Sequence, residues 1–187
     1  MTRAFVAIPL PVDCQTMLDQ MQQELRSAGA EVGWVAIRSI HLTLKFLGEV
    51  SPEIIPGLAE SLKSAPEPES GFELRLHGVG CFPNPRNPRV VWCGIDGDTD
   101  ALQRLQKRVE AVCDRFGFPP EGRDFKPHLT LGRVKGKRNL QPLVDCIKIG
   151  SALERRFKVD HFNLYQSTLK PKGAVYDILD TIGLHEN

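Results

Sequence analysis

His41-Leu42-Thr43-Leu44 opens the stretch 41–50, and the chain repeats this tetrapeptide as His128-Leu129-Thr130-Leu131. Each copy alternates polar with apolar residues. On a strand this alternation places the histidine and threonine on one face and both leucines in the core. Two such strands lying side by side would bring two imidazoles and two hydroxyls to one pocket, which is a suitable arrangement for binding a phosphate.

Composition indicates an ordinary globular chain. The 187 residues are 41% hydrophobic and 25% charged, which predicts one compact domain over residues 1–187. The formal net charge of +1 provides no overall field that would attract nucleic acid. Any polyanion must therefore bind through a local basic patch, and a long duplex is not expected as the main partner.

The cysteines and the apolar runs indicate the compartment. Five cysteines are odd in number and lack a C-x-x-C spacing, so we expect reduced core thiols in a cytoplasmic protein. The apolar run at 4–8 stops at Pro9, and no other stretch approaches the ~20 apolar residues of a membrane span. We expect neither export nor membrane association.

Periodicity and turn residues predict the order of elements. The expected strands are 4–8, the first motif up to Gly48, 72–77, 90–93, the second motif, 154–166 and 174–182. The expected helices are 13–29, 51–62, 98–117 and one near 140–150. The expected loops are 65–71, 82–89 and 119–126, with a hairpin turn at Lys170-Pro171-Lys172-Gly173.

The two halves of this order are similar, because each places a motif strand between helical segments. We therefore predict an α+β fold of two pseudo-symmetric lobes, with antiparallel sheets flanked by helices. The motif strands would line an active-site cleft between the lobes.

The side chains of the repeated motif suit acid–base catalysis. Histidine has an ordinary pKa of ~6.5, so one copy can be neutral while the other is protonated near pH 7. In phosphodiester hydrolysis one imidazole would take a proton from water and the other would protonate the leaving oxygen, each role contributing ~10²–10⁴ in rate. The threonine hydroxyls would donate to the non-bridging phosphate oxygens.

Other chemistries fit the sequence less well. A catalytic zinc normally has three protein ligands, whereas the motif histidines have no Cys, Asp or Glu at ligand spacing. No G-x-S-x-G nucleophile elbow is present. His77 on a solvated strand face, His161 within a strand and His185 in the tail are not assigned to catalysis. We expect neither a metal nor a cofactor.

At these residues the chain resembles the 2H phosphoesterase superfamily, which is named for two H-x-[ST]-x motifs. Within it, the chain is similar to the RNA 2′,3′-cyclic phosphodiesterases once called 2′-5′ RNA ligases. The resemblance covers residues 41–49 and 125–133 in full. It extends to Arg3-Ala4-Phe5-Val6-Ala7-Ile8, Trp34 and Leu164-Tyr165-Gln166-Ser167.

The resemblance implies a bilobal, duplicated α+β fold and metal-independent opening of a 2′,3′-cyclic phosphate at an RNA end, leaving a 2′-phosphate. It implies that His41 is the proton donor, His128 the proton acceptor, and Thr43 and Thr130 the phosphate clamps. It also implies weak, reversible 2′-5′ joining of RNA with the histidine roles exchanged. The expected partners are RNA ends, with no obligate protein partner and a monomeric state.

Further contacts are weighed from strand parity. Lys45 shares the parity of His41, so it is a candidate phosphate ligand, with an ordinary solvated cation as the alternative. Arg133 falls on the opposite parity unless the strand ends or twists near Gly132, and Phe46 shares the core face with Leu44. A basic rim that suits an RNA end would comprise Arg86, Arg89, Arg123 and Lys126.

Two alternative functions remain open. The same fold could act on a small substrate, such as a nucleoside 2′,3′-cyclic phosphate or an ADP-ribose cyclic phosphate. A non-catalytic module that binds RNA ends could use the same pocket, although binding alone needs donors and no matched acid–base pair. The sequence also leaves open which histidine is the acid.

Overall fold

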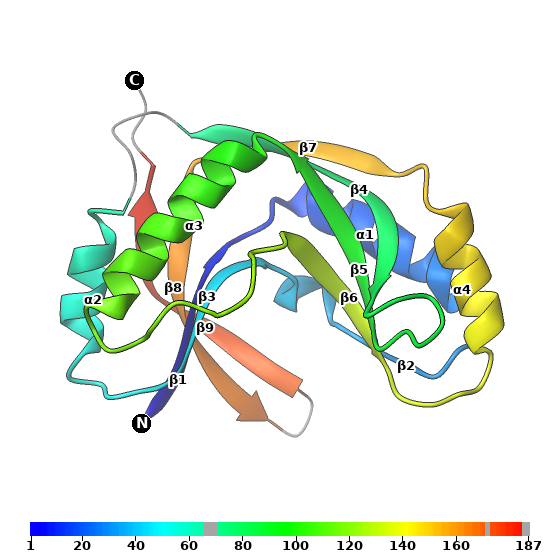
Figure 1. Ribbon diagram of the computed structural model, residues 1–187, viewed down its shortest axis with the longest axis horizontal. Helices are drawn as coiled ribbons and strands as arrows, with labels where there is room; N and C mark the ends of the chain where they lie inside the picture. Colours follow the sequence, from blue (N-terminus) through cyan, green and yellow to red (C-terminus); the bar gives the residue numbers. More distant parts are fainter. Residues whose placement is uncertain (66–70, 171–172, 185–187) are drawn as a thin grey trace.

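The strands form two antiparallel sheets, each with helices packed against it (Figure 1). The computed structural model describes residues 1–65, 71–170 and 173–184. The first sheet has the order β3-β1-β8-β9, with β1 (Thr2–Ile8), β3 (Leu42–Val50), β8 (His161–Lys170) and β9 (Gly173–Gly183). The second has the order β2-β6-β5-β4-β7, with β2 (Val32–Trp34), β4 (Phe72–Phe82), β5 (Val90–Gly97), β6 (His128–Val134) and β7 (Glu154–Val159).

The helices divide between the two sheets. Helices α2 (Ile55–Leu62) and α3 (Thr99–Asp114) pack on the first sheet, which with them forms the first lobe. Helices α1 (Val12–Arg26) and α4 (Leu140–Ile149) pack on the second sheet and complete the second lobe. The α+β fold of two antiparallel lobes is therefore confirmed.

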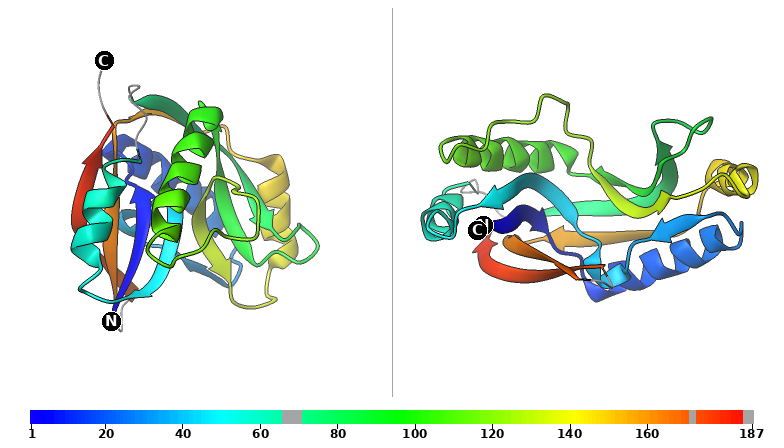
Figure 2. Two further views of the ribbon diagram at one scale, coloured as in Figure 1. Left: turned by 60° about the vertical axis from the view of Figure 1, so that its left-hand side comes forward. Right: turned by 90° about the horizontal axis from the view of Figure 1, so that it is seen from below.

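The lobes do not correspond to the two halves of the chain. Helix α1 follows a strand of the first sheet but packs on β7, and α3 follows a strand of the second sheet but packs on β3. Figure 2 shows α1 and α3 on opposite outer sides of the molecule. The chain thus crosses between the lobes repeatedly, and each motif strand is held by segments from both halves.

The helices form where apolar residues recur with helical spacing. In α3 the buried stripe comprises Leu102, Leu105, Val109, Val112 and Cys113, as the sequence predicts. The chain turns away after α1 and α3 through Gly29 (φ 66°) and Gly117 (φ 86°), left-handed conformations that glycine adopts without a Cβ penalty.

The prediction of one long strand over 154–166 is wrong. The structure has β7 in the second sheet and β8 in the first, separated at Asp160. Burial changes phase there, from Phe157 and Val159 to Phe162 and Leu164, so one strand could not bury both pairs on one face. This break passes the chain from one lobe to the other.

Several expected loops are only partly described. Strands β8 and β9 pair in antiparallel register from Lys170 opposite Gly173, which agrees with the predicted hairpin, while its residues 171 and 172 lie outside the described part. Residues 66–70 of the predicted loop and His185 also lie outside it. The short strand β2 was not predicted.

The described core contains most of the cysteines. Cys14, Cys81, Cys93 and Cys113 are buried, Cys146 is partly exposed, and all five thiols are free, in agreement with the expected reduced core thiols. Among the described helices, none is both long and apolar enough to cross a membrane.

Candidate active site

The two motifs lie on β3 and β6, one in each lobe. His41 directly precedes β3, and His128 is the first residue of β6. The motif leucines are buried, whereas Thr43 and Thr130 are partly exposed on the opposite face. The separation of a polar face from a core face that the alternation predicts is therefore present in both strands.

Each motif strand carries a β-bulge at the fourth motif residue. In β3 the pairing with β1 passes from Thr43 to Lys45 and skips Leu44. In β6 the pairing with β5 passes from Thr130 to Gly132 and skips Leu131. A bulge inserts one extra residue and reverses the facing of the residues that follow it. The duplication thus extends from the sequence to an irregularity of the backbone.

The bulges change which side chains share the histidine face. The expectation that Lys45 lies on the His41 face is wrong, because after the bulge Lys45 is buried with only 2% of its surface exposed. Phe46, which was expected in the core, is 62% exposed and lies beside Phe5, with ring centroids 6.2 Å apart. In β6 the same shift turns the exposed Arg133 to the face of Thr130 and His128.

The His41 ring lies in an aromatic environment. It stacks on Phe5 with ring centroids 4.6 Å apart, and Tyr176 meets it edge-on at 5.2 Å. Phe5 in turn stacks with Tyr165, whose ring centroid lies 5.0 Å from its own. Burial among these rings lowers the pKa of His41 to about 4, because the imidazolium loses hydration there, and a backbone hydrogen bond with Ser39 opposes this shift.

The orientation of His128 is set by the backbone before it. Its Nδ1 lies 2.7 Å from the carbonyl oxygen of Lys126. A carbonyl only accepts, so Nδ1–H donates and Nε2 of the neutral ring is left as an acceptor. Phe82 meets this ring edge-on, with centroids 5.0 Å apart. Each motif histidine therefore bonds the residue two positions before it, Ser39 or Lys126, and contacts a phenylalanine of another strand.

Segments of the second lobe connect the two motifs. Strand β2 pairs with β6 from Trp34 opposite Gly132, and the Val35 N–H donates to the carbonyl of Leu131. The buried Gln22 amide donates to the carbonyls of both Val35 and Leu131. The segment that leads from β2 to His41 is thereby fixed to the bulge of the second motif.

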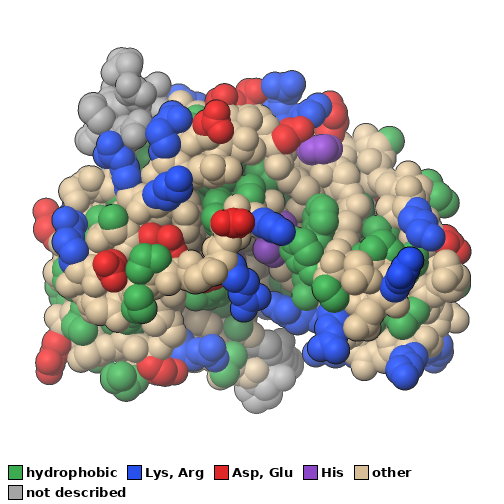
Figure 3. Space-filling view, in the orientation of Figure 1, with side chains coloured by type: hydrophobic (Ala, Val, Ile, Leu, Met, Phe, Trp, Pro, Cys, Tyr) green, Lys and Arg blue, Asp and Glu red, His purple; other side chains and the backbone are tan. Residues whose placement is uncertain are grey.

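The Tyr176 hydroxyl is influenced by charges that come from both lobes. Burial raises the pKa of the Tyr176 hydroxyl, and the positive charges of Arg133 and Arg3 act against that rise. Arg133 comes from the second motif strand, whereas Tyr176 contacts the first motif histidine. Figure 3 shows histidine atoms within a hollow at the centre of one face, with Lys and Arg side chains beside it.

The aromatic neighbours of the histidines, which include Tyr165 with its ring centroid 6.1 Å from that of His41, were not predicted as site residues. Phe5, Tyr176 and Phe82 come from β1, β9 and β4, and their proximity depends on strand order, which a single sequence does not reveal. For Phe5 the sequence contained an indication of such a role, because Phe5 lies in the stretch Arg3 to Ile8, which is part of the resemblance to the 2H phosphoesterases.

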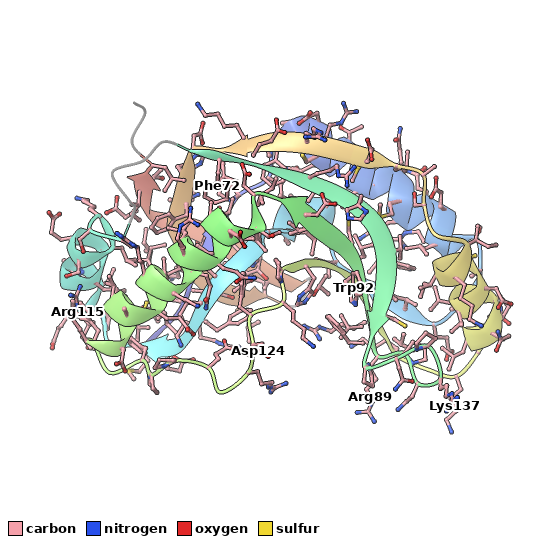
Figure 4. All side chains as sticks on the ribbon, turned by 45° about the horizontal axis from the view of Figure 1, so that its top comes forward. Phe72, Arg89, Trp92, Arg115, Asp124 and Lys137 are labelled. Atoms are coloured by element: carbon pink, nitrogen blue, oxygen red, sulfur yellow. The ribbon has the colours of Figure 1, made fainter. Side chains whose placement is uncertain are left out.

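The proposed rim cations and the other described histidines lie on the surface of the molecule. The proposed rim cations Arg86, Arg89, Arg123 and Lys126 are all exposed. Figure 4 shows Arg89 extending outward at the same edge as Lys137. His77 is 44% exposed and pairs with Asp96 at 3.0 Å within a surface charge network, which agrees with its solvated strand face. His161 pairs with the adjacent Asp160.

Named proteins are similar to this chain over most of its length. A chain from Aeropyrum pernix named RNA 2′,3′-cyclic phosphodiesterase is 36% identical over 163 residues, 87% of this chain and 92% of the relative. One of the same name from Methanothermobacter thermautotrophicus is 34% identical and covers 97% of this chain and 98% of its own.

Solved structures match over nearly the whole chain. A Thermus thermophilus protein superposes with a TM-score of 0.82 at 29% identity, covering 97% of both chains. Escherichia coli LigT complexed with 3′-AMP gives 0.77 at 27% identity, covering 98% of both chains. The model of the 2′-5′ RNA ligase superfamily matches residues 22–170, including both bulged motifs. The chain therefore belongs to the 2′-5′ RNA ligase superfamily of 2H phosphoesterases.

Proposed function

We propose that the protein hydrolyses 2′,3′-cyclic phosphates at RNA ends and leaves a 2′-phosphomonoester. The observation that carries this proposal is the pair of bulged His-x-Thr strands, one from each lobe, each presenting an imidazole and a hydroxyl on one face. The names of the relatives from Aeropyrum and Methanothermobacter support the substrate class, and the complex of LigT with 3′-AMP supports nucleotide binding by this fold.

His128 is the proposed proton acceptor. Its Nδ1–H is engaged by the Lys126 carbonyl, so Nε2 has the free lone pair that a base requires. Nε2 takes a proton from the attacking water as the oxygen of that water bonds to phosphorus.

His41 is the proposed proton donor. It gives a proton to O3′ as the P–O3′ bond breaks, so the phosphate stays on O2′ and the 3′ hydroxyl is restored. Burial keeps His41 neutral in the free protein, since its pKa is lowered to about 4. A phosphodiester anion entering the cleft favours the imidazolium and raises this pKa. Substrate binding would thus favour protonation of His41, which a general acid requires.

Thr43 and Thr130 are the proposed phosphate clamps, since both hydroxyls lie on the histidine face and can donate to the non-bridging oxygens. Arg133 joins them because its bulged strand turns it to the same face. Lys45 is not included, because its ammonium is buried on the other face. The proposal needs no metal or cofactor for either proton transfer.

The test is product analysis on an oligonucleotide ending in a 2′,3′-cyclic phosphate, with and without EDTA. We expect only the 2′-phosphate product, at a rate that EDTA does not change and that His41→Ala and His128→Ala each lower by about 10²–10⁴-fold. A 3′-phosphate product, or turnover unchanged in both variants, would overturn the assignment. A mononucleotide cyclic phosphate assayed in parallel separates an RNA enzyme from one for small substrates.

Weak 2′-5′ joining would follow the same course with a 5′-hydroxyl in place of water: His128 takes the proton of that hydroxyl as its oxygen bonds to phosphorus, and His41 protonates O3′ as the P–O3′ bond breaks. The exchange of roles expected from the sequence applies instead to the reverse reaction, cleavage of the 2′-5′ linkage, in which the 3′ hydroxyl attacks phosphorus and the 5′ oxygen leaves. Incubation of a 2′,3′-cyclic phosphate end with a 5′-hydroxyl end should give a small amount of 2′-5′-linked product, and the same histidine variants should abolish it.

A further inference from the structure

Lys45 is a buried cation on the first motif strand with an unusual set of partners. Its Nζ donates to the Glu110 carboxylate of α3 at 3.3 Å and to the carbonyl oxygen of Pro119. Only 2% of the Lys45 side chain and 15% of the Glu110 side chain are exposed. Burying a charge in this way is costly unless it is paired and hydrogen-bonded, so these contacts fix where Lys45 lies.

The partners of Lys45 belong to the connection that leads to the second motif. Glu110 also accepts a hydrogen bond from the backbone N–H of Glu121 at 3.1 Å. Lys45 and Glu110 therefore hold residues 119–121 at two backbone positions. These residues lie in the connection between the end of α3 and the start of β6, which Figures 1 and 2 show. Residues 122–127 then lead from the anchored positions to His128. Asp124, labelled in Figure 4, lies on this connection.

Helix α3 also contacts the first motif at its bulge. The buried Gln106 amide donates to the carbonyl of Leu44 at 3.5 Å, next to the contact of Glu110 with Lys45. The bulge turns Lys45, which follows it, toward α3. The same strand therefore presents Thr43 on the histidine face and Lys45 on the opposite face, where it holds the loop.

We propose that Lys45 is a positioning residue that ties the entry loop of the second motif, residues 119–127, to the first motif strand. The loop sets the place of Lys126, whose carbonyl selects the Nδ1–H tautomer of His128. Lys45 thus acts on the proposed base from the other lobe, without touching substrate. This inference rests on the proposed function only for its kinetic consequence.

The decisive variant removes both charges together. Replacing one partner by an apolar residue would leave the other buried charge without both its ion pair and the hydrogen bond within that pair and could unfold the protein, whereas Lys45→Met with Glu110→Leu leaves neither charge. Glu110→Gln is the conservative variant, since its amide oxygen still accepts from Lys45 and from Glu121. Lys63→Met with Glu60→Leu is the matched control, because it removes an exposed ion pair of 2.7 Å in the same lobe.

The first readout is the imidazole ¹⁵N NMR spectrum of His128, which does not require activity. We expect the Nδ1–H tautomer in the wild type, in Glu110→Gln and in the control, and a mixture of tautomers in Lys45→Met/Glu110→Leu. An unchanged His128 spectrum in a folded Lys45→Met/Glu110→Leu protein would overturn the proposal, whatever the enzyme turns out to hydrolyse.

The second readout is turnover of an oligonucleotide that ends in a 2′,3′-cyclic phosphate. A displacement of a catalytic group by about 1 Å costs on the order of 10²-fold, so we expect kcat to fall about 10- to 100-fold with KM changed less than threefold. Glu110→Gln should stay within threefold of wild type. A loss confined to KM would contradict positioning of the base. Wild-type protein without turnover would refute the proposed function and leave the NMR test of Lys45 intact.

Discussion

The ring of His41 stacks on the ring of Phe5, with centroids 4.6 Å apart and planes inclined by 23°. Phe5 is only 3% exposed, so this face of the imidazole is shielded from water. An uncharged imidazole is favoured in such surroundings. The stack with Phe5 therefore favours the neutral form of the proposed acid, His41, before substrate binds.

The free protein should show His41 titrating far below an ordinary histidine. We expect its C2 proton to report a pKa of about 4, and Phe5→Ser to raise that pKa toward 6.5 by readmitting water. NMR titration measures both values. Adding a nucleoside 2′-phosphate should also raise the pKa of His41, and a His41 that titrates near 6.5 in the free wild type would contradict this description.

The same shift makes stability depend on pH. Because the folded-state pKa of His41 lies below its unfolded value, the unfolded chain takes up the proton first as pH falls from 6.5 to 4. The contribution of His41 is fully present above pH 6.5 and is lost by pH 4, a change of about 3 kcal/mol in the free energy of unfolding. Urea unfolding at both pH values should show this additional loss in wild type compared with His41→Asn, and parallel curves for the two proteins would rule it out.

The two histidines should act as a unit in turnover. We expect His41→Ala and His128→Ala each to lower kcat by about 10²–10⁴. The double variant should lose little more than the worse single variant, because either loss already interrupts the paired proton transfer. Steady-state kinetics on a cyclic-phosphate oligonucleotide measures this, and fully multiplicative losses would indicate independent roles. Circular dichroism checks that the variants fold.

The rim cations should matter only for longer substrates. Arg86→Glu with Arg89→Glu should raise KM for an oligonucleotide and reduce the slope of log(1/KM) against log[salt] by about 0.7 per lost phosphate contact. The mononucleotide KM should stay unchanged, since it presents only the reacting phosphate. A control reversal at the exposed Arg115, which precedes Gly117 at the end of α3, should change neither KM. Equal effects on both substrates would place these arginines at the cleft itself.

Sequence periodicity predicted the elements that bury one regular face. Helix α3 and the motif strands follow from leucines and valines at fixed spacing, and the repeated motif led directly to His41 and His128. Strand parity failed at Leu44 and Leu131, because a bulge depends on the pairing partner as well as on the strand itself. The bulge in β3 explains why Lys45 is buried and Phe46 is exposed, and the bulge in β6 explains why Arg133 lies on the histidine face.

Strand order was the other property that the sequence did not supply. Phe5, Tyr176 and Phe82 are distant from the motifs along the chain and meet the histidines only through pairing in the sheets. The passage of the chain from one sheet to the other at Asp160 is accompanied by a local signal, because the alternation of apolar residues shifts by one position between Val159 and Phe162. The continuous β-rich composition of 154–166 concealed that change.

The division of labour between His41 and His128 can be tested most directly with a cyclic phosphate in which sulfur replaces the bridging O3′. A thiolate leaves without protonation, so a protein that lacks only its general acid should recover activity on this substrate. We predict that His41→Ala cleaves the sulfur substrate at least about 10²-fold faster than the oxygen substrate, the lower end of what a general acid contributes, whereas His128→Ala shows no such recovery. Recovery in His128→Ala and not in His41→Ala would contradict the assignment of His41 as the acid and His128 as the base.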